Sequence, residues 1–308
     1  MTAFTIGREA IVLQSPPIGG VQDMEPTASL KCPSAISPSG ISTYRQCPLK
    51  FYFSKIAKLP DPSGEAALVG TFVHSVLADL LGRESEDRDV EAARGIASAR
   101  WPQFTDEIAE LGLDESGAAA FKRSSWAKIA GYFELEDPRG VVAVAIEQAY
   151  RCEIGGESGG AVYGILDRLD ERDDGVVVVD YKTGKVPKPR YRQSTLDQLR
   201  IYAALVSVES DVTPVACSLY YLGAGEILTE EVTEETLVHV ADLVSDTWSA
   251  IRSDMAERAF VAKPGPLCPW CSFSAICPAR GGAGANSVRA SSAAVAMTAT
   301  RSGGGTPC

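Results

Sequence analysis

The stretch GILDRLDERDDGVVVVDYKTGK, residues 164–185, constrains the fold of this 308-residue chain more than any other part of it. Its four consecutive valines, 176–179, indicate a strand buried on both faces, because a strand with one face in water alternates apolar and polar residues. A second β-rich run precedes the valines, and an Asp-Asp-Gly sequence separates the two runs. We therefore expect a β-hairpin whose second strand has no solvent-exposed face.

The turn of this hairpin decides which residues of its two strands face each other. If the Asp-Gly pair at 174–175 forms the turn, Asp167 lies opposite Lys182. If the Asp-Asp pair one residue earlier forms the turn, Asp167 lies opposite Asp180. Asp180 and Lys182 are two residues apart on one strand and so share a face. Either register gathers two carboxylates and one ammonium on one patch, whereas an odd loop length would separate them.

Two acids beside a lysine suit the hydrolysis of a phosphodiester. That reaction needs a cation to neutralise the phosphate, a nucleophilic water and a group that stabilises the transition state. Asp167 and Asp180 could hold Mg²⁺ or Mn²⁺ through oxygen ligands, and Lys182 could orient the water. The alternative is an Asp that caps a turn and a D-x-K triplet that occurs by chance. The buried strand before the triplet and the positive charge after it favour catalysis.

The rest of the sequence predicts an α/β fold, because helical and β-type hydrophobic patterns alternate along it. In chain order, the expected elements are a helix with a short aromatic stretch over 39–58, a helix over 70–81, a helical region to about 132, three strands from 141 to about 182, a helix over 194–208, strands at 215–222 and 227–232, and a helix over 234–259.

Composition places the chain among ordinary soluble globular proteins, with 45% hydrophobic and 22% charged residues. No apolar run approaches the roughly 18 residues of a membrane span. The first residues lack a basic segment followed by an apolar one, so we expect a cytoplasmic protein with no membrane partner.

The net charge of −11 argues against nonspecific coating of nucleic acid, which depends on Lys and Arg. One basic stretch departs from this average, with six cations and one acid between Tyr181 and Arg200. Its DNA-binding candidates are Lys185, Lys188, Arg190 and Arg192. A solvated loop is the alternative interpretation.

Three motifs in this region resemble the RecB-like branch of the PD-(D/E)XK nucleases, which includes the C-terminal nuclease of AddB-type proteins and the Cas4 nucleases. GILDRLD is similar to the family's G-x-x-D-R-x-D motif, DYKTG to its D-x-K motif and DQLRIYA to its Q-x-x-x-Y helix. The resemblance covers residues 37–278 and implies a restriction-endonuclease-like α/β core, a central mixed β-sheet flanked by helices. It implies that Asp167 and Asp180 bind a metal ion. It also implies that the Tyr181 carbonyl adds a ligand and that Lys182 is catalytic.

The same resemblance implies roles for four further residues. His74, in GTFVHSVLADLL, would supply another metal ligand, and Glu147 matches an acid often present on the family's first strand. On the residues alone, a single histidine beside apolar residues is more often a packed side chain, and a lone strand Glu is often solvated. Gln198 and Tyr202 lie one helical turn apart and share a face, which would lie beside the site. Ordinary helix packing is the alternative for this pair.

Cysteines form a C-x2-C-x5-C pattern near the C-terminus, at Cys268, Cys271 and Cys277. The candidate for a fourth ligand is the distant Cys47. This layout resembles the iron–sulfur variant of the same family, in which one early and three late cysteines hold a [4Fe–4S] cluster. Four thiolates would also suit zinc, although structural zinc sites more often use two tight pairs. A cluster would tie the first helix to the final segment of the domain.

These assignments divide the chain into three parts. They are an irregular lead-in over 1–34, a nuclease domain over 35–280 and a disordered small-residue tail over 281–308. Within the domain, we expect a helical part at 39–139, a nuclease core at 140–260 and a cysteine segment at 261–280.

The expected function is that of a metal-dependent DNA nuclease, an exonuclease on single-stranded DNA or DNA ends in repair or recombination. Its expected cofactors are Mg²⁺ or Mn²⁺ and a [4Fe–4S] cluster, and a helicase or repair protein would be its partner. Three alternatives stay open: a catalytically silent iron–sulfur subunit that binds DNA, a Cas4-like nuclease of CRISPR spacer acquisition, and a zinc-stapled interaction protein. The presence of Asp167, Asp180 and Lys182 argues against the silent subunit.

Overall fold

The computed structural model describes residues 31–61 and 64–281, so the expected lead-in and tail lie outside the described residues apart from their inner ends. All described helices and strands belong to one compact unit that begins at Cys32. Its centre is a five-stranded sheet in the order β1-β2-β3-β4-β5. The strands are β1 (Ala143–Ile154), β2 (Gly160–Arg172), β3 (Gly175–Lys182), β4 (Ala216–Tyr221) and β5 (Glu226–Glu231).

The sheet is mixed. β1, β2 and β3 form an antiparallel meander, β4 runs parallel to β3, and β5 returns antiparallel to β4. Two parallel neighbours need a crossover connection, and here α7 (Gln193–Ser210) joins β3 to β4. The strand that carries Asp180 and Lys182 is therefore the middle strand of the sheet.

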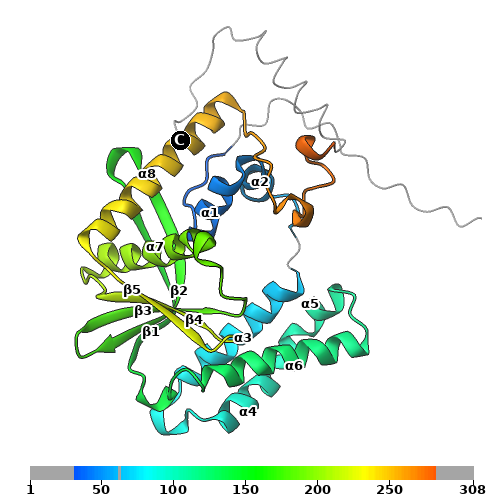
Figure 1. The fold of residues 1–308 in the computed structure, drawn as a ribbon, viewed down its shortest axis with the longest axis vertical. Coiled ribbons are helices and arrows are strands. Elements are labelled where there is room, and N and C mark those ends of the chain that lie inside the picture. Colours follow the sequence, from blue (N-terminus) through cyan, green and yellow to red (C-terminus); the bar gives the residue numbers. More distant parts are fainter. Residues whose placement is uncertain (1–30, 62–63, 282–308) are drawn as a thin grey trace, which may run out of the picture. The chain divides into compact units, whose positions relative to one another are not determined.

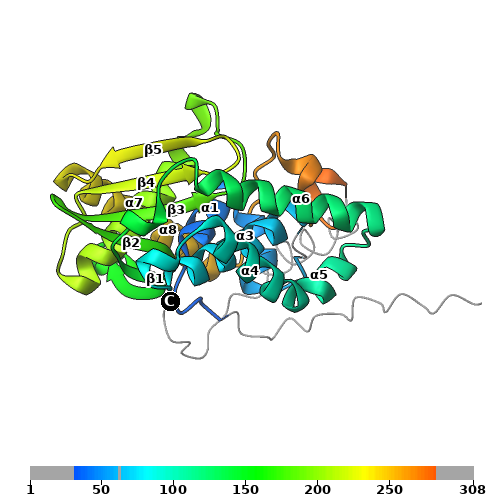
Figure 2. The same cartoon turned by 90° about the horizontal axis from the view of Figure 1, so that it is seen from below.

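Helices cover both faces of the sheet, as Figures 1 and 2 show. One layer contains α1 (Pro38–Gln46), α7 and α8 (Glu234–Glu257). The other contains α3 (Glu65–Leu81), α4 (Val90–Arg100) and α6 (Glu115–Tyr132). Shorter pieces are α2 (Pro48–Phe51), a turn of π-helix at Tyr52–Ile56 and α5 (Thr105–Glu110). The expected mixed sheet flanked by helices, with a helical N-terminal part, is confirmed.

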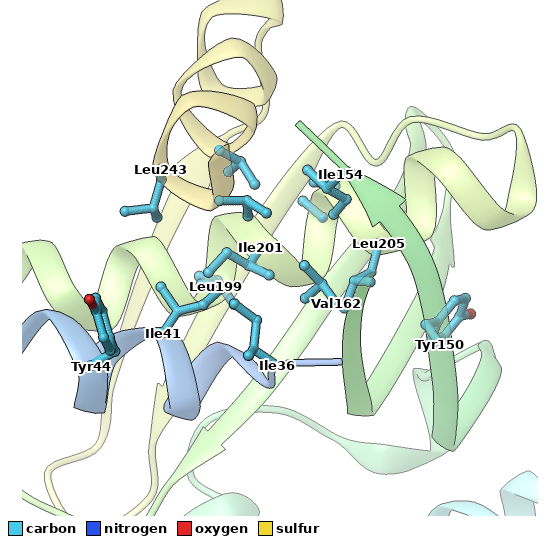
Figure 3. Packing of buried hydrophobic residues seen from close by; sticks show 14 of the residues in the cluster. Ile36, Ile41, Tyr44, Tyr150, Ile154, Val162, Leu199, Ile201, Leu205 and Leu243 are labelled. Carbon is cyan, nitrogen blue, oxygen red and sulfur yellow. The ribbon is translucent and has the colours of Figure 1, made fainter. Parts of the chain in front are cut away.

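The valines of β3 divide between two hydrophobic cores, one on each face of the sheet. Val178 belongs to the core beneath α1, α7 and α8, whereas Val177 and Val179 belong to the core beneath α3 and α6. All three are buried, which confirms the strand without a solvent face. Figure 3 shows the first core, which contains Leu199 and Ile201 of α7 together with Val162 of β2.

The β2–β3 pairing decides between the two hairpin registers. Arg172 pairs with Gly175, which leaves a two-residue turn at 173–174. The same register, continued to the far end of the strands, puts Asp167 opposite Asp180. The second of the two alternatives is therefore correct.

Two helix boundaries differ from the predicted ones. The first helix stops at Gln46 because Cys47 is extended, with φ −160° and ψ 103°. The residue before a proline disfavours the helical conformation, and Pro48 follows. The second helix begins at Glu65 instead of Gly70. Residues 65–69 are EAALV, mostly good helix formers, and Gly70 does not interrupt them.

Within the ranges that the structure describes, none of the helices combines the length and the apolar composition needed to cross a membrane.

Candidate active site

The candidate active site lies where β2 and β3 part from each other. Their pairing ends at Arg168 and Val179. Beyond this pair, the Tyr181 N–H of β3 donates to the side chain of Asp167 instead of to a backbone carbonyl of β2, with 2.7 Å between the nitrogen and Asp167 Oδ2. A carboxylate therefore occupies the fork between two strands.

Helix α3 brings His74 to the same fork. Its Nδ1 lies 3.2 Å from Asp167 Oδ1, and its Nε2 lies 3.1 Å from the carbonyl oxygen of Tyr181. Burial lowers the pKa of His74, but the neighbouring carboxylates outweigh burial and raise it above its usual value. The imidazole thus faces two of the groups that the family resemblance implied as metal ligands, the Asp167 carboxylate and the Tyr181 carbonyl.

Glu147 reaches the site from β1 through an unusual backbone conformation. The pairs Ile146↔Arg168 and Gln148↔Leu166 flank it, so Glu147 lies opposite Asp167. Its φ of +49° is in the left-handed region, which is uncommon for a residue other than glycine and often marks a functional position. Ligand atoms of His74, Glu147 and Asp167 all lie within 4.8 Å of one another.

Asp180 and Lys182 form an ion pair beside this group, with Lys182 Nζ 2.7 Å from Asp180 Oδ2. Burial raises the pKa of Asp180 to about 6, although Lys182 opposes the shift. Burial and the charge of Asp167 also raise the pKa of Glu147. Crowded carboxylates of this kind are stabilised by a bound cation. Their oxygens, with a histidine nitrogen nearby, fit a divalent ion such as Mg²⁺ or Mn²⁺.

Helix α7 places Gln198 and Tyr202 beside the carboxylates. Burial, followed by the charges of Asp180 and Asp167, raises the pKa of Tyr202, which also hydrogen-bonds to Gln198. The Tyr202 ring can approach β2 only because Gly164 has no side chain: a Cβ there would lie 2.7 Å from Tyr202 Cε1. This close approach explains the glycine of GILDRLD.

Comparison with known proteins agrees with this geometry. The sequence model of the PD-(D/E)XK nuclease superfamily matches residues 35–278. The chain belongs to the PD-(D/E)XK nuclease superfamily. It is therefore a nuclease, a phosphodiester hydrolase, and nucleases of this superfamily generally depend on a divalent metal ion.

Solved structures similar to the nuclease include a candidate exonuclease from Eubacterium rectale, with 16% identity, a TM-score of 0.46 and coverage of 77% of this chain and 87% of that one. A protein named SSO0001 has 18% identity and a TM-score of 0.38, with coverage of 82% and 90%. Neither likeness is close enough to indicate a substrate. No curated protein matches the sequence.

Arg168 is a residue of the nuclease that sequence reasoning missed. It is completely buried on β2, on the face of the sheet opposite to the Asp180 side chain, where its Nη1 donates to the Tyr181 hydroxyl at 2.7 Å. It also forms ion pairs with Glu136 and, at 2.8 Å, with Asp170. The signal was available, since an arginine on an interior strand of a sheet covered on both faces needs buried partners. The partners themselves depend on which helix covers that strand.

The basic stretch forms the connection from β3 to α7. Lys185, Lys188 and Arg190 are exposed, and Arg192 is half-buried with its Nε donating to the Pro187 carbonyl at 3.0 Å. Among residues 31–61 and 64–281, none of these four side chains forms an ion pair with a carboxylate. Their charge is therefore available to a ligand that approaches Lys182.

The four cysteines of the expected cluster come from two segments that pack together. The Leu49 N–H donates to the Val261 carbonyl at 3.3 Å, and the Phe53 and Phe273 ring centroids are 5.4 Å apart. The Lys263 N–H lies 3.5 Å from Cys47 Sγ. Within the described ranges, however, no three cysteine sulfurs lie within 4.8 Å of one another. The segments meet, but the sulfurs do not have the spacing of a single-ion zinc site.

Proposed function

We propose that the nuclease cleaves DNA with Mg²⁺ or Mn²⁺ bound at the fork between β2 and β3, as an exonuclease on single-stranded DNA or DNA ends in repair or recombination. The observation that carries this proposal is the convergence of His74, Glu147 and Asp167 within 4.8 Å. Three separate elements supply these residues, and the Asp180–Lys182 pair lies beside them on β3.

The proposed roles follow from the contacts. Asp167 and Asp180 hold the metal ion, and the Tyr181 carbonyl, which His74 already faces, supplies a neutral oxygen nearby. The bound ion supplies positive charge to the phosphate and lowers the pKa of a water molecule. Lys182 orients that water and counters charge that develops on the phosphate.

His74 and Glu147 complete the donor set from two sides. An imidazole nitrogen and a carboxylate oxygen are both suitable ligands for Mn²⁺. Gln198 and Tyr202 limit the space on the α7 side and orient groups near the carboxylates. The exposed Lys185, Lys188 and Arg190 attract the DNA backbone toward Lys182.

We also propose that Cys47, Cys268, Cys271 and Cys277 bind a [4Fe–4S] cluster. One early cysteine that meets a late triplet suits a cluster better than zinc, because structural zinc sites more often use two tight pairs. Two backbone N–H groups support this proposal, those that point at Cys47 Sγ from Lys263 and at Cys268 Sγ from Gly265, at 3.5 and 3.2 Å. Hydrogen bonds to sulfur are common around such clusters and tune their reduction potential.

The test is the degradation of end-labelled single- and double-stranded DNA by anaerobically purified protein with Mn²⁺ or Mg²⁺. Asp180→Ala and Lys182→Ala should each abolish cleavage. Asp173→Ala is the matched control, since Asp173 lies in the exposed turn of the same hairpin and should leave cleavage unchanged.

Iron content and visible absorbance, recorded on the same preparation, test the cluster separately. A brown protein that binds DNA without cutting it would contradict the metal site and favour a silent subunit. A colourless protein that cuts DNA would contradict the cluster alone.

A further inference from the structure

A pocket lined by aromatic and basic side chains lies in the helical part of the nuclease, between α3, α4 and α6. Its volume is about 330 Å³. We call it the tryptophan pocket. Two indoles and two cations form its walls, with apolar side chains as its floor: Trp101, Trp126, Arg94, Lys122, Phe72 and Ile129.

The tryptophan pocket lies on a different side of α3 from the candidate active site. Phe72 and His74 are two residues apart on this helix, so their side chains point roughly 200° apart around its axis. The pocket and the metal site are thus separate, but a single helix connects them.

The charge of the tryptophan pocket is opposite to that of the protein. Its only charged lining residues, Arg94 and Lys122, are cations, in a chain with a net charge of −11. Neither residue forms a close ion pair within the described ranges, since the Arg94 contact with exposed Glu91 is 3.9 Å long. The pocket therefore suits an anionic ligand.

Each cation instead lies over an indole ring. Lys122 Nζ is 4.1 Å from the Trp101 ring centroid, and the Arg94 guanidinium carbon is 4.5 Å from that of Trp126. Both cations are exposed and on long side chains, so they can move. A contact with phosphate is charge-assisted and stronger than an exposed cation–π contact, so an incoming phosphate would draw the cations from the rings. The ring faces would then be open to a flat ligand.

We propose that the tryptophan pocket binds one nucleotide unit of single-stranded DNA, with the base against Trp101 or Trp126 and the phosphate between Arg94 and Lys122. Base–indole stacking tolerates any sequence, and aromatic rings interleaved with cations are typical of single-strand binding surfaces. A paired and stacked base cannot enter such a pocket. The proposal rests on the proposed DNA nuclease function. It implies that the DNA bound at the helical part of the nuclease is single-stranded.

The experiment measures binding of the full chain to a fluorescein-labelled single-stranded oligothymidylate by anisotropy, with EDTA present so that no cleavage occurs. We compare Lys122→Ala, Arg94→Ala and the double variant across a range of salt concentrations. The double variant should bind on the order of tenfold more weakly near 0.1 M salt, and its log–log salt slope should become shallower by about 0.7 for each lost phosphate contact.

Arg123→Ala is the matched control. Arg123 is the neighbour of Lys122 on α6, is equally exposed and does not line the pocket. Its removal should change neither the affinity nor the slope by a comparable amount. Trp126→Leu, which keeps an apolar side chain, should weaken single-strand binding with an unchanged salt slope and should leave duplex binding as it is.

The proposal fails if the double variant binds with the affinity and slope of the parent, or if Arg123→Ala loses as much. Equal weakening of duplex binding by Trp126→Leu would refute the base contact. Cleavage assays on the same preparations with Mn²⁺ distinguish failure of the pocket proposal from failure of the proposed nuclease function. Cleavage without any effect of the pocket variants overturns the pocket alone, and pocket effects in a protein that never cleaves overturn the proposed function alone.

Discussion

Arg168 is the largest side chain that the described part of the chain buries completely, and it lies directly behind the candidate active site. Its contact with the Tyr181 hydroxyl anchors a residue whose main chain does two other things: the N–H bonds to Asp167 and the carbonyl faces His74. One buried cation thus anchors the residue whose main chain contacts two groups of the metal site, Asp167 and His74. Positioning groups of this kind commonly affect metal affinity.

Tyr181→Phe tests this positioning role. The change removes one acceptor from a buried guanidinium, so we expect a loss of about 1.5–3 kcal/mol in the free energy of unfolding. Mn²⁺ binding should weaken about tenfold, measured by calorimetry. Tyr220→Phe is the control, because the Tyr220 hydroxyl donates to Glu136 in the same network, at 3.0 Å, from the neighbouring strand. It should cost similar stability with no change in Mn²⁺ affinity; equal metal effects of both variants would contradict the role.

At the scale of single residues, the carboxyl group of Asp180 should also make metal binding depend on pH. Burial raises the pKa of Asp180 to about 6, so below that pH its carboxyl is protonated in the metal-free protein and a proton competes with the metal ion. Mn²⁺ affinity should therefore rise as the pH rises through about 6, and His74, whose pKa is raised above its usual value, should extend the rise to higher pH. Calorimetry at about one pH unit on either side checks this. An affinity independent of pH would show that Asp180 does not bind the ion.

At the scale of elements, the site depends on how closely α7 approaches β2. Gly164 permits the approach, and Tyr202 closes the space that the missing side chain leaves. Glu147 on β1, which has a left-handed backbone conformation, lies opposite Asp167. Through Glu147 a third strand contributes a side chain to the candidate active site. Three strands and two helices therefore meet at one fork.

Gly164→Ala tests the α7 contact. The added Cβ would lie 2.7 Å from the Tyr202 ring, so the helix or the ring has to move. Overpacking of this kind typically costs about 1–3 kcal/mol, and we expect a lower melting temperature together with reduced cleavage. Gly223→Ala, in the turn between β4 and β5 where the structure places nothing within 4 Å of the new Cβ, should change neither. An unchanged melting temperature in Gly164→Ala would mean that α7 is not held against β2.

At the scale of the whole molecule, the segment after α8 returns to the beginning of the domain. The contacts between Leu49 and Val261 and between Phe53 and Phe273 join parts of the chain more than two hundred residues apart. Ser272 adds a hydrogen bond to Asp61 at 2.6 Å. A cofactor bound by Cys47 and the three late cysteines would close this long loop and stabilise both ends.

Cys47→Ser tests this closure. We expect loss of iron and faster proteolytic cleavage within 261–281, because the segment then relies on only a few contacts with the rest of the domain. Cys152→Ser is the control, since Cys152 lies on β1 outside the set and should retain iron and protease resistance. Normal iron content in Cys47→Ser would remove Cys47 from the ligand set.

The sequence by itself determined the order of helices and strands, the doubly buried strand and the D-x-K triplet at its end. The hydrophobic pattern of a segment is a local property, and the four consecutive valines Val176–Val179 indicate a buried strand within a single segment. It also limited the hairpin to two registers, both of which gathered Asp167, Asp180 and Lys182.

Only the tertiary structure decided which register forms, because the choice between two neighbouring turns depends on packing of the strands against α3 and α7. Only the tertiary structure also showed three further features: the left-handed backbone conformation of Glu147, the contact of His74 with the Tyr181 carbonyl and the partners of Arg168. Each of these features depends on residues from different elements, and the sequence separation of those residues does not predict that they are in contact. The tryptophan pocket likewise exists because three helices meet, and packing, not sequence periodicity, sets which side chains line it.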